Sequence, residues 1–296
     1  MGRVTSISWT DATWNPVRGC SRVSEGCRNC YAEKVAARFS GPGQAYEGLA
    51  NRETQRWTGK VRLVHEHLED PIRWKKPRRV FVNSMSDLFH ENLPEADIDR
   101  IFAAMSRTPR HTFQVLTKRA DRMQEYVAHP DRAARVLMAV DPALSLEEAK
   151  VIQCNWPWPL PNVWLGVSVE DQRTLDERLP FLQHSPATIR FLSAEPLLGA
   201  LDLFNATHGV EDIGAEETRS CHQVDWVILG GESGPGSRPL ELDWIRRAIG
   251  TCREAGMTAV FVKQLGTCWA KARGDLGKGD IVSRWPEDLR VQEFPL

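Results

Sequence analysis

The 296-residue chain has no apolar run close to the roughly 20 residues that a membrane-spanning helix needs, and residues 1–8 lack the apolar core of a signal peptide. It also has no excess charge of either sign, because 38 lysines and arginines stand against 39 aspartates and glutamates. We therefore expect a cytoplasmic protein with no membrane partner, whose overall field attracts neither nucleic acid nor anionic lipid. Hydrophobic residues form 42% of the chain, which is enough for a sizeable core.

Cysteine is sparse outside one short segment. The chain has seven cysteines, an odd number, and Cys20, Cys27 and Cys30 lie close together near the N-terminus. In a reducing compartment such a group indicates metal ligation rather than disulfide pairing. The spacing of the other four does not indicate a second cluster, so we expect ordinary core or loop thiols at Cys154, Cys221, Cys252 and Cys268.

The three clustered cysteines have the spacing C-x6-C-x2-C in GCSRVSEGCRNCYAEKVAARF, which continues into a predicted helix over residues 31–39. Gly19 and Gly26 precede two of them and let the backbone fold closely around a bulky ligand. Three thiolates cannot complete a four-cysteine site, but a 4Fe-4S cluster held by three leaves one iron open to a small molecule. S-adenosyl-L-methionine (SAM) occupies that position in radical enzymes.

A structural zinc site is the main alternative, with His65, His67 or His90 as the fourth ligand. Zinc usually takes paired C-x2-C units, or one such unit with a close histidine pair, and only one C-x2-C is present. Core cysteines without any metal are the third alternative. The spacing therefore favours the iron-sulfur cluster over zinc.

Short apolar runs that end in polar or glycine residues alternate with helix-like stretches along the chain. The predicted strands are residues 79–87, 112–119, 162–171, 189–196, 225–234 and 258–266, with a shorter one at 13–17. The predicted helices between them are residues 95–107, 120–127, 172–183 and 242–255. This alternation predicts an α/β fold, a partial (β/α) barrel of six or seven mainly parallel strands, with its active site at the carboxyl ends of the strands.

Two stretches interrupt the alternation and are expected to be insertions over the barrel rim. They are residues 128–161 and residues 203–224. We expect the barrel domain to span residues 1–266 and residues 267–296 to form an irregular C-terminal cap.

A resemblance covers nearly the whole chain. The N-terminal block reads WTDATWNPVRGCSRVSEGCRNCYAE, and the later blocks read FVNSMSDLFH, LTKR, WLGVSVE, FLSAEPLLG, GGESGPGSRP, FVKQLG and WPEDLRV. Together they resemble a phage and bacterial family of three-cysteine-motif proteins of unknown function, related to the radical SAM superfamily. The resemblance implies a partial β/α barrel with the cluster loop after the first strand, but no substrate.

The sequence departs from the commonest pattern of that superfamily in two places. The usual first spacing is C-x3-C, whereas six residues separate Cys20 from Cys27. A Gly-Gly-Glu-like element that grips the methionine amino group usually follows the second strand, where this chain has NSMSD at residues 83–87. GGE occurs only at residues 230–232.

Polar residues at the predicted strand ends are candidates for binding SAM. Asp87, with Ser84 and Ser86, would accept hydrogen bonds from the methionine ammonium, the alternative being a helix N-cap. Lys118, followed by Arg119, would pair with the methionine carboxylate, the alternative being a solvated pair that opens a helix. Superfamily enzymes commonly contact the ribose hydroxyls from the fourth strand, which implies that role for Ser168 and Glu170.

Charged residues at the later strand ends are the catalytic candidates. Glu195 and Glu232 would face the barrel mouth, where a carboxylate is costly unless it is paired or used. Lys263 would orient a substrate amide, base or phosphate. The alternative for the two glutamates is a buried salt bridge with Lys118 or Lys263.

These observations predict an enzyme that cleaves SAM reductively to a 5'-deoxyadenosyl radical, which abstracts hydrogen from a substrate. It would need a flavodoxin- or ferredoxin-like reductant. A nucleobase or nucleic acid is the substrate class suggested by the phage association and by the basic stretch at residues 73–79, although such a run is more often a solvated surface. The alternative is a non-catalytic module, stabilised by zinc or a cluster, that binds nucleic acid or a partner protein.

Overall fold

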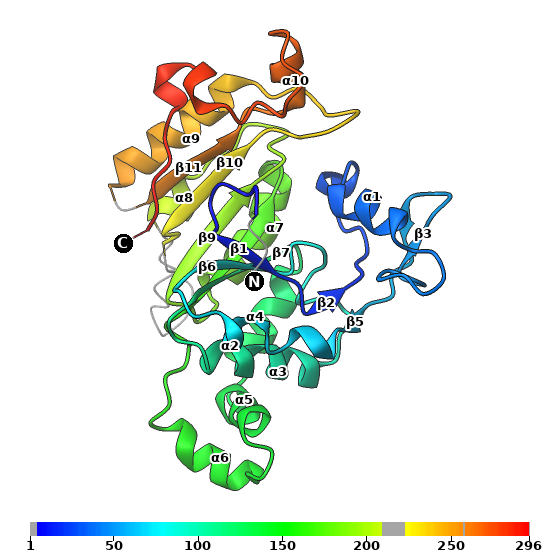
Figure 1. The fold of residues 1–296 in the computed structure, drawn as a ribbon. Coiled ribbons are helices and arrows are strands. Elements are labelled where there is room, and N and C mark those ends of the chain that lie inside the picture. Colours follow the sequence, from blue (N-terminus) through cyan, green and yellow to red (C-terminus); the bar gives the residue numbers. More distant parts are fainter. Residues whose placement is uncertain (1–4, 209–222, 257, 296) are drawn as a thin grey trace. The chain divides into compact units, whose positions relative to one another are not determined.

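The computed structural model describes residues 5–208, 223–256 and 258–295 (Figure 1). Within these residues a parallel sheet of seven strands has the order β1-β6-β7-β8-β9-β10-β11. The strands are β1 (Ala12–Trp14), β6 (Arg79–Val82), β7 (Thr112–Thr117), β8 (Val163–Val169), β9 (Ile189–Ala194), β10 (Trp226–Gly230) and β11 (Ala259–Gln264). With its surrounding helices the sheet forms an α/β partial barrel, which confirms the predicted fold class.

The six longer predicted strands each contain an observed strand, because strands covered on both faces form nearly continuous apolar sequences. The short strand predicted at 13–17 is β1 over Ala12–Trp14, and Val17 belongs to the separate strand β2. All five residues of β10 are buried, and so are six of the seven residues of β8. The predicted helices are also present. They are α1 (Tyr31–Arg38), α3 (Glu95–Ser106), α4 (Ala120–Ala128), α7 (Gln172–Gln183) and α9 (Leu242–Ala255).

Contacts divide the chain into two compact units. The first contains Met1–Val23, Cys30–Leu165 and Ser185–Thr188, and the second contains Ser24–Asn29, Gly166–His184 and Ile189–Leu296. The segment between the first two cysteines is thus shared between the units. The expected C-terminal cap falls within the second unit, where it begins with the short helix α10 (Thr267–Lys271).

In the first unit, β1, β6 and β7 pair in parallel, with Val80 opposite Phe113 in the buried centre. Two short antiparallel pairs lie between β1 and β6 along the chain, β2 (Val17–Arg18) with β5 (Arg62–Leu63) and β3 (Ala50–Asn51) with β4 (Arg56–Trp57). Residues 128–161 contain α5 (Arg132–Val140) and α6 (Leu146–Gln153), which pack on each other, and α5 packs on α3 (Figure 1). The insertion is therefore helical, and α5 attaches it to α3 and α4.

The α3–α5 contact is organised by Arg132, whose side chain has no exposed surface. Its guanidinium donates to Asp99 Oδ1 at 2.8 Å and Glu95 Oε2 at 2.7 Å, both on α3. It also lies over the ring of Tyr126 from α4, 3.7 Å from the centroid. Tyr126 donates its hydroxyl proton to the same Asp99 oxygen at 2.7 Å. Arg132 therefore links three helices through charged and aromatic contacts in a buried position.

In the second unit, β9, β10 and β11 pair in parallel, and α9 lies beside β11 (Figure 1). The amide of Val262 donates to the carbonyl of Val291, so the C-terminal segment covers the outer edge of β11. α8 (Phe204–His208) begins the second expected insertion, and most of residues 203–224 lie outside the described residues. Across the described part of the chain, no helix is long and apolar enough to span a bilayer.

Candidate functional site

Two of the three clustered cysteines lie at the ends of helical elements, and Cys20 lies in the loop after β2. Cys27 ends the 3-10 turn η1 (Glu25–Cys27), and Cys30 is the N-cap of α1. All three carry thiols rather than disulfides and are partly exposed. Among the described residues, no group of three His, Cys, Asp or Glu side chains stands ready to enclose a metal ion. The donor chemistry and the partial exposure of the three thiols fit a thiolate-bound cluster.

The chain that leads to Cys20 is bound to the turn that follows β6. Asn83 Oδ1 accepts the amide of Val17, and Ser86 Oγ donates to the Val17 carbonyl at 2.9 Å. Ser84 Oγ donates to Asn15 Oδ1 at 3.2 Å. Both serines that were predicted to bind SAM therefore use their hydroxyls to hold residues 15–17.

Gly19, directly before Cys20, has a φ of +95°. A Cβ on it would lie 2.1 Å from the carbonyl oxygen of Lys60, so the turn into Cys20 requires glycine. Gly19 was expected to let the backbone fold around a bulky ligand; the group that the structure places against it is the carbonyl of Lys60, and the expected ligand contact stays a prediction.

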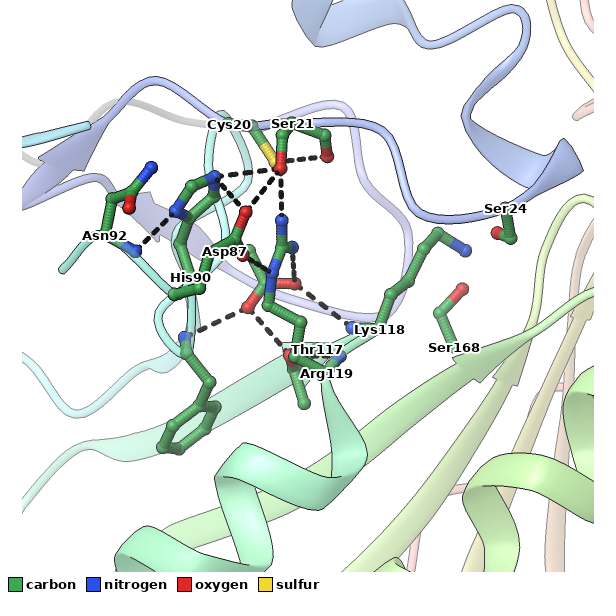
Figure 2. Close-up of polar contacts among 12 residues, drawn as sticks. Cys20, Ser21, Ser24, Asp87, His90, Asn92, Thr117, Lys118, Arg119 and Ser168 are labelled. Atoms are coloured by element: carbon green, nitrogen blue, oxygen red, sulfur yellow. Dashed lines mark hydrogen bonds and ion pairs between the residues drawn. The ribbon is translucent and has the colours of Figure 1, made fainter. Parts of the chain in front are cut away.

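Ser21 connects the loop after Cys20 to the strand ends of the first unit (Figure 2). Its hydroxyl donates to Glu91 Oε1 at 3.0 Å and accepts from Arg119 Nη2 at 2.7 Å. His90 Nδ1 accepts the amide of Asn92, so the neutral ring carries its proton on Nε2 and donates it to Ser21 Oγ at 3.0 Å. The hydroxyl thus makes all three hydrogen bonds of which it is capable.

The charged groups around Ser21 shift one another's pKa values. Burial alone would raise the pKa of Glu91, but the hydrogen bond from Arg119 lowers it to about 2. Burial opposes the charge on Arg119, yet the carboxylates of Asp87 and Glu91 raise its pKa. Burial, and then the positive charge of Arg119, lower the pKa of His90, which keeps this ring neutral near pH 7. Both nitrogens of the buried His90 ring are engaged in hydrogen bonds within the protein, and its role as a zinc ligand stays a prediction.

Asp87 accepts four hydrogen bonds in this network (Figure 2). Oδ1 accepts from Thr117 Oγ1 at 2.7 Å and from the Phe89 amide at 3.0 Å. Oδ2 accepts from the Lys118 amide and from Arg119 Nη1, each at 3.1 Å. These four contacts fill the acceptor sites of a carboxylate, leaving none for a methionine ammonium in this conformation.

The alternative structural roles predicted for Asp87 (a helix N-cap) and for Lys118 with Arg119 (a solvated pair) are wrong in their details. Residues 88–92 form turns, so Asp87 caps a turn and not a helix. Arg119 is the N-cap of α4, but only 7% of its side chain is exposed, so it is not half of a solvated pair. Lys118 contributes its backbone amide to Asp87, and its predicted contact with the methionine carboxylate stays a prediction.

Two further contacts in the first unit hold α1, which begins directly after Cys30. Arg22 forms a salt bridge with Glu33 of α1, whose side chain is 2% exposed and also accepts the amide of Trp57 at 2.9 Å. Tyr31 donates its hydroxyl proton to the Ser84 carbonyl at 2.6 Å. The residues on either side of the cysteines therefore have structural partners.

In the second unit, residues 24–29 are bound to the ends of β8 and β10. Glu170 accepts from Ser24 Oγ at 2.9 Å and pairs with Arg178 of α7. Glu232 accepts from Asn29 Nδ2 at 3.0 Å and pairs with Arg238. The carbonyl of Ser168 accepts from Arg178, and its side chain is buried. The predicted ribose contacts of Ser168 and Glu170 stay predictions.

Glu195 and Lys263 form the ion pair that sequence reasoning gave as an alternative to catalysis. Lys263 Nζ donates to both carboxylate oxygens of Glu195 at 2.7 Å, and each side chain is 17% exposed. Gln264 Nε2 adds a hydrogen bond at 3.1 Å to Glu195 Oε1. The pair joins the ends of β9 and β11 and retains some access to solvent, so it is both a structural contact and a candidate for contacting a substrate.

The basic stretch at residues 73–79 is partly neutralised. Arg73 pairs with Glu69 and Asp70, and Arg79 pairs with Asp11. Arg78 lies 5.5 Å from the ring centroid of Trp74. Lys75 and Lys76 are exposed.

Sequence reasoning missed the partners of the strand-end carboxylates. Asn29, Arg178 and Arg238 were not singled out, nor was the role of Ser21. The polar composition of the segment between the cysteines could have indicated these contacts. Residues 21–26 (SRVSEG) and 28–29 (RN) supply side chains that reach the strand ends.

Comparison with known proteins places the chain in one group. A family model described as "Protein of unknown function (DUF5131)" matches residues 4–287, nearly the whole chain. Neither the curated proteins nor the solved structures contain a significant match. The match carries no information about SAM chemistry.

Proposed function

Because the chain belongs to the DUF5131 family, whose function is unknown, we propose from its own residues that it is a radical SAM enzyme. Cys20, Cys27 and Cys30 would ligate three irons of a 4Fe-4S cluster. When bound at the fourth iron and reduced by one electron, SAM supplies a 5'-deoxyadenosyl radical that abstracts hydrogen from a substrate. The family relation to the radical SAM superfamily is part of this proposal.

The observation that carries the proposal is the set of three partly exposed thiols in C-x6-C-x2-C on a partial-barrel fold. Four-cysteine spacing would favour a closed electron-transfer cluster or a zinc site, whereas three thiolates leave one coordination position open. The loop around Cys20 follows β1, in keeping with ligand sites at the carboxyl ends of parallel strands.

The protein's own groups hold the loop around Cys20, and the Cys20 thiol itself donates to the Ser21 carbonyl at 3.4 Å. In the first unit, Ser21 and Arg22, on the loop after Cys20, are bound by side chains from other segments. In the second unit, Glu195 and Lys263 present a partly exposed ion pair at the strand ends. We assign to that pair the orientation of the substrate, because a lysine and a carboxylate provide both a donor and an acceptor.

The proposal requires a one-electron reductant of the flavodoxin or ferredoxin type. Its substrate is a nucleobase or a nucleic acid, a class supported by the exposed Lys75 and Lys76 in the stretch beside Trp74. These lysines precede β6, so they lie toward the amino ends of the strands and would bind a nucleic-acid backbone away from the site of chemistry.

Reductive cleavage of SAM tests the proposal. Protein reconstituted anaerobically with iron and sulfide, then mixed with dithionite and SAM, should release 5'-deoxyadenosine, measured by liquid chromatography and mass spectrometry. Oligonucleotides and free nucleobases are the first substrates to add, and the correct one should accelerate release. The matched control is the same protein without dithionite, which should release none. A cluster that forms but yields no 5'-deoxyadenosine would favour the non-catalytic binding module.

A further inference from the structure

Two buried glutamates of the second unit hold the segment that carries Cys27. We propose that Glu170 and Glu232 are positioning residues, which fix residues 24–29 and so set the place of the Cys27 thiol. This inference rests on the proposed function and changes the roles expected for both residues. Neither glutamate then contacts SAM or substrate, since each acts through the cysteine segment.

Glu170 holds the first half of the segment from the end of β8. Its side chain is 1% exposed, and it accepts from Ser24 Oγ at 2.9 Å while Arg178 balances its charge at 3.3 Å. Gly26 lies so close that a Cβ would come within 2.3 Å of Glu170 Oε1 and 2.5 Å of its Cγ. The glycine before Cys27 is therefore required by the protein's own carboxylate.

Glu232 holds the second half from the end of β10. Its side chain is 6% exposed and its Oε2 accepts from Asn29 Nδ2 at 3.0 Å, from the Arg238 amide at 2.8 Å and from Arg238 Nε at 3.0 Å. Arg238 Nη2 reaches further, to the carbonyl of Glu25 at 3.0 Å. Burial would raise the pKa of Glu232, but its hydrogen bonds from Arg238 and Asn29 lower it below the ordinary value, so the carboxylate is ionised near neutral pH.

The segment between these two anchors is short and internally bonded. The amides of Cys27 and Arg28 donate to the carbonyls of Ser24 and Glu25 at 2.9 and 3.0 Å, forming one 3-10 turn. One turn is too short to keep its shape alone, so its order depends on the side chains that bind it at both ends. Ser24 and Gly26, which contact Glu170, both belong to the six residues between Cys20 and Cys27. The long first spacing therefore supplies the contacts that position Cys27.

Hydrogen exchange in the metal-free protein tests the inference without any cluster. Glu170→Gln and Glu232→Gln each weaken a charge-assisted contact, and the peptide containing Cys27 and Arg28 should exchange about tenfold faster, which corresponds to about 1.4 kcal/mol. Glu177→Gln is the matched control, because Glu177 pairs with Arg173 on the exposed face of α7 and should leave this peptide unchanged. Unchanged exchange in both test variants would overturn the inference.

A second variant covers the case in which a buried glutamine disturbs the fold. The Ser24→Ala, Asn29→Ala double variant removes the segment's side of both contacts and leaves each glutamate with its arginine. It should show the same faster exchange at residues 27 and 28 with unchanged exchange in β10. Exchange equal to wild type would again contradict the inference.

The iron-loaded protein separates positioning from a merely structural role. In the double variant, absorbance at about 400 nm should decay about tenfold faster on exposure to a chelator, while the urea midpoint of unfolding stays at the wild-type value. Equal decay would count against positioning. If wild-type protein takes up no iron and sulfide, the proposed function fails, whereas the exchange result in metal-free protein still decides whether the two glutamates order the segment.

Discussion

Cys27→Ala is expected to abolish the iron-sulfur cluster. A 4Fe-4S cube held by three thiolates has no spare protein ligand, so removing one leaves two irons without protein donors and the cluster does not persist. The iron and sulfide contents measured after anaerobic reconstitution should fall from about four of each per chain to background, with loss of the absorbance at about 400 nm. Cys20→Ala and Cys30→Ala should behave alike, since the three thiols act as one ligand set.

Cys154→Ala is the matched control for these variants. Cys154 is an exposed thiol at the C-cap of α6 in the helical insertion and is not part of the proposed ligand set. Its variant should bind as much iron and sulfide as wild type. Full cluster content in Cys27→Ala, or equal loss in Cys154→Ala, would show that iron is held elsewhere or adventitiously.

Arg132→Met should lower the free energy of unfolding by about 3–5 kcal/mol, because removing one partner of a buried ion pair leaves the other charge unpaired. Arg132 has no exposed side-chain surface, and the Asp99 side chain that it contacts is 10% exposed. The methionine would fill similar space but restore neither the hydrogen bonds to Asp99 and Glu95 nor the contact with Tyr126. Urea unfolding followed by circular dichroism at pH 7 measures the loss.

Arg135→Met is the control, because Arg135 pairs with the same Glu95 at 3.3 Å but is 40% exposed. Its loss should be at most about 1 kcal/mol, as for other surface ion pairs. The hydrogen bond from Arg132 lowers the pKa of Glu95 below 4.5, so this pair contributes stability above that pH and loses it as the pH falls through the lower folded value. The difference in free energy of unfolding between wild type and Arg132→Met should therefore become smaller as the pH falls below about 4.5. Equal effects of the two variants at pH 7 would contradict this account.

The fold was predictable because its strands are buried on both faces and so leave continuous apolar runs between polar strand ends. The run WVILGG, for example, contains all of β10, and the residues expected to form α9 were the residues found. The division into two compact units was not predictable. Residues 24–29 group with the second unit through contacts of Ser24 and Asn29 with residues about 150 and 200 positions later, and no local pattern encodes those distances.

The residue types of the candidate site were predictable from the sequence, but the partner that each side chain contacts was less so. Polar groups at strand ends were recognised, yet the sequence does not state which partner each one takes. Asp87 illustrates the difference, because it was expected to await a ligand ammonium and instead accepts four hydrogen bonds from the protein. Glu195 pairs with Lys263, one of the two partners considered, although β10 lies between their strands in the sheet. Such pairings follow from strand order, which only the structure gives.

Mössbauer spectroscopy of wild-type protein, reconstituted anaerobically with enriched iron and recorded before and after addition of SAM, tests the central claim most directly. The account predicts about four irons per chain in a 4Fe-4S cluster, with one of the four sites changing its signal when SAM is added. Stoichiometric zinc in place of iron, or a cluster whose four irons are all unaffected by SAM, would contradict it.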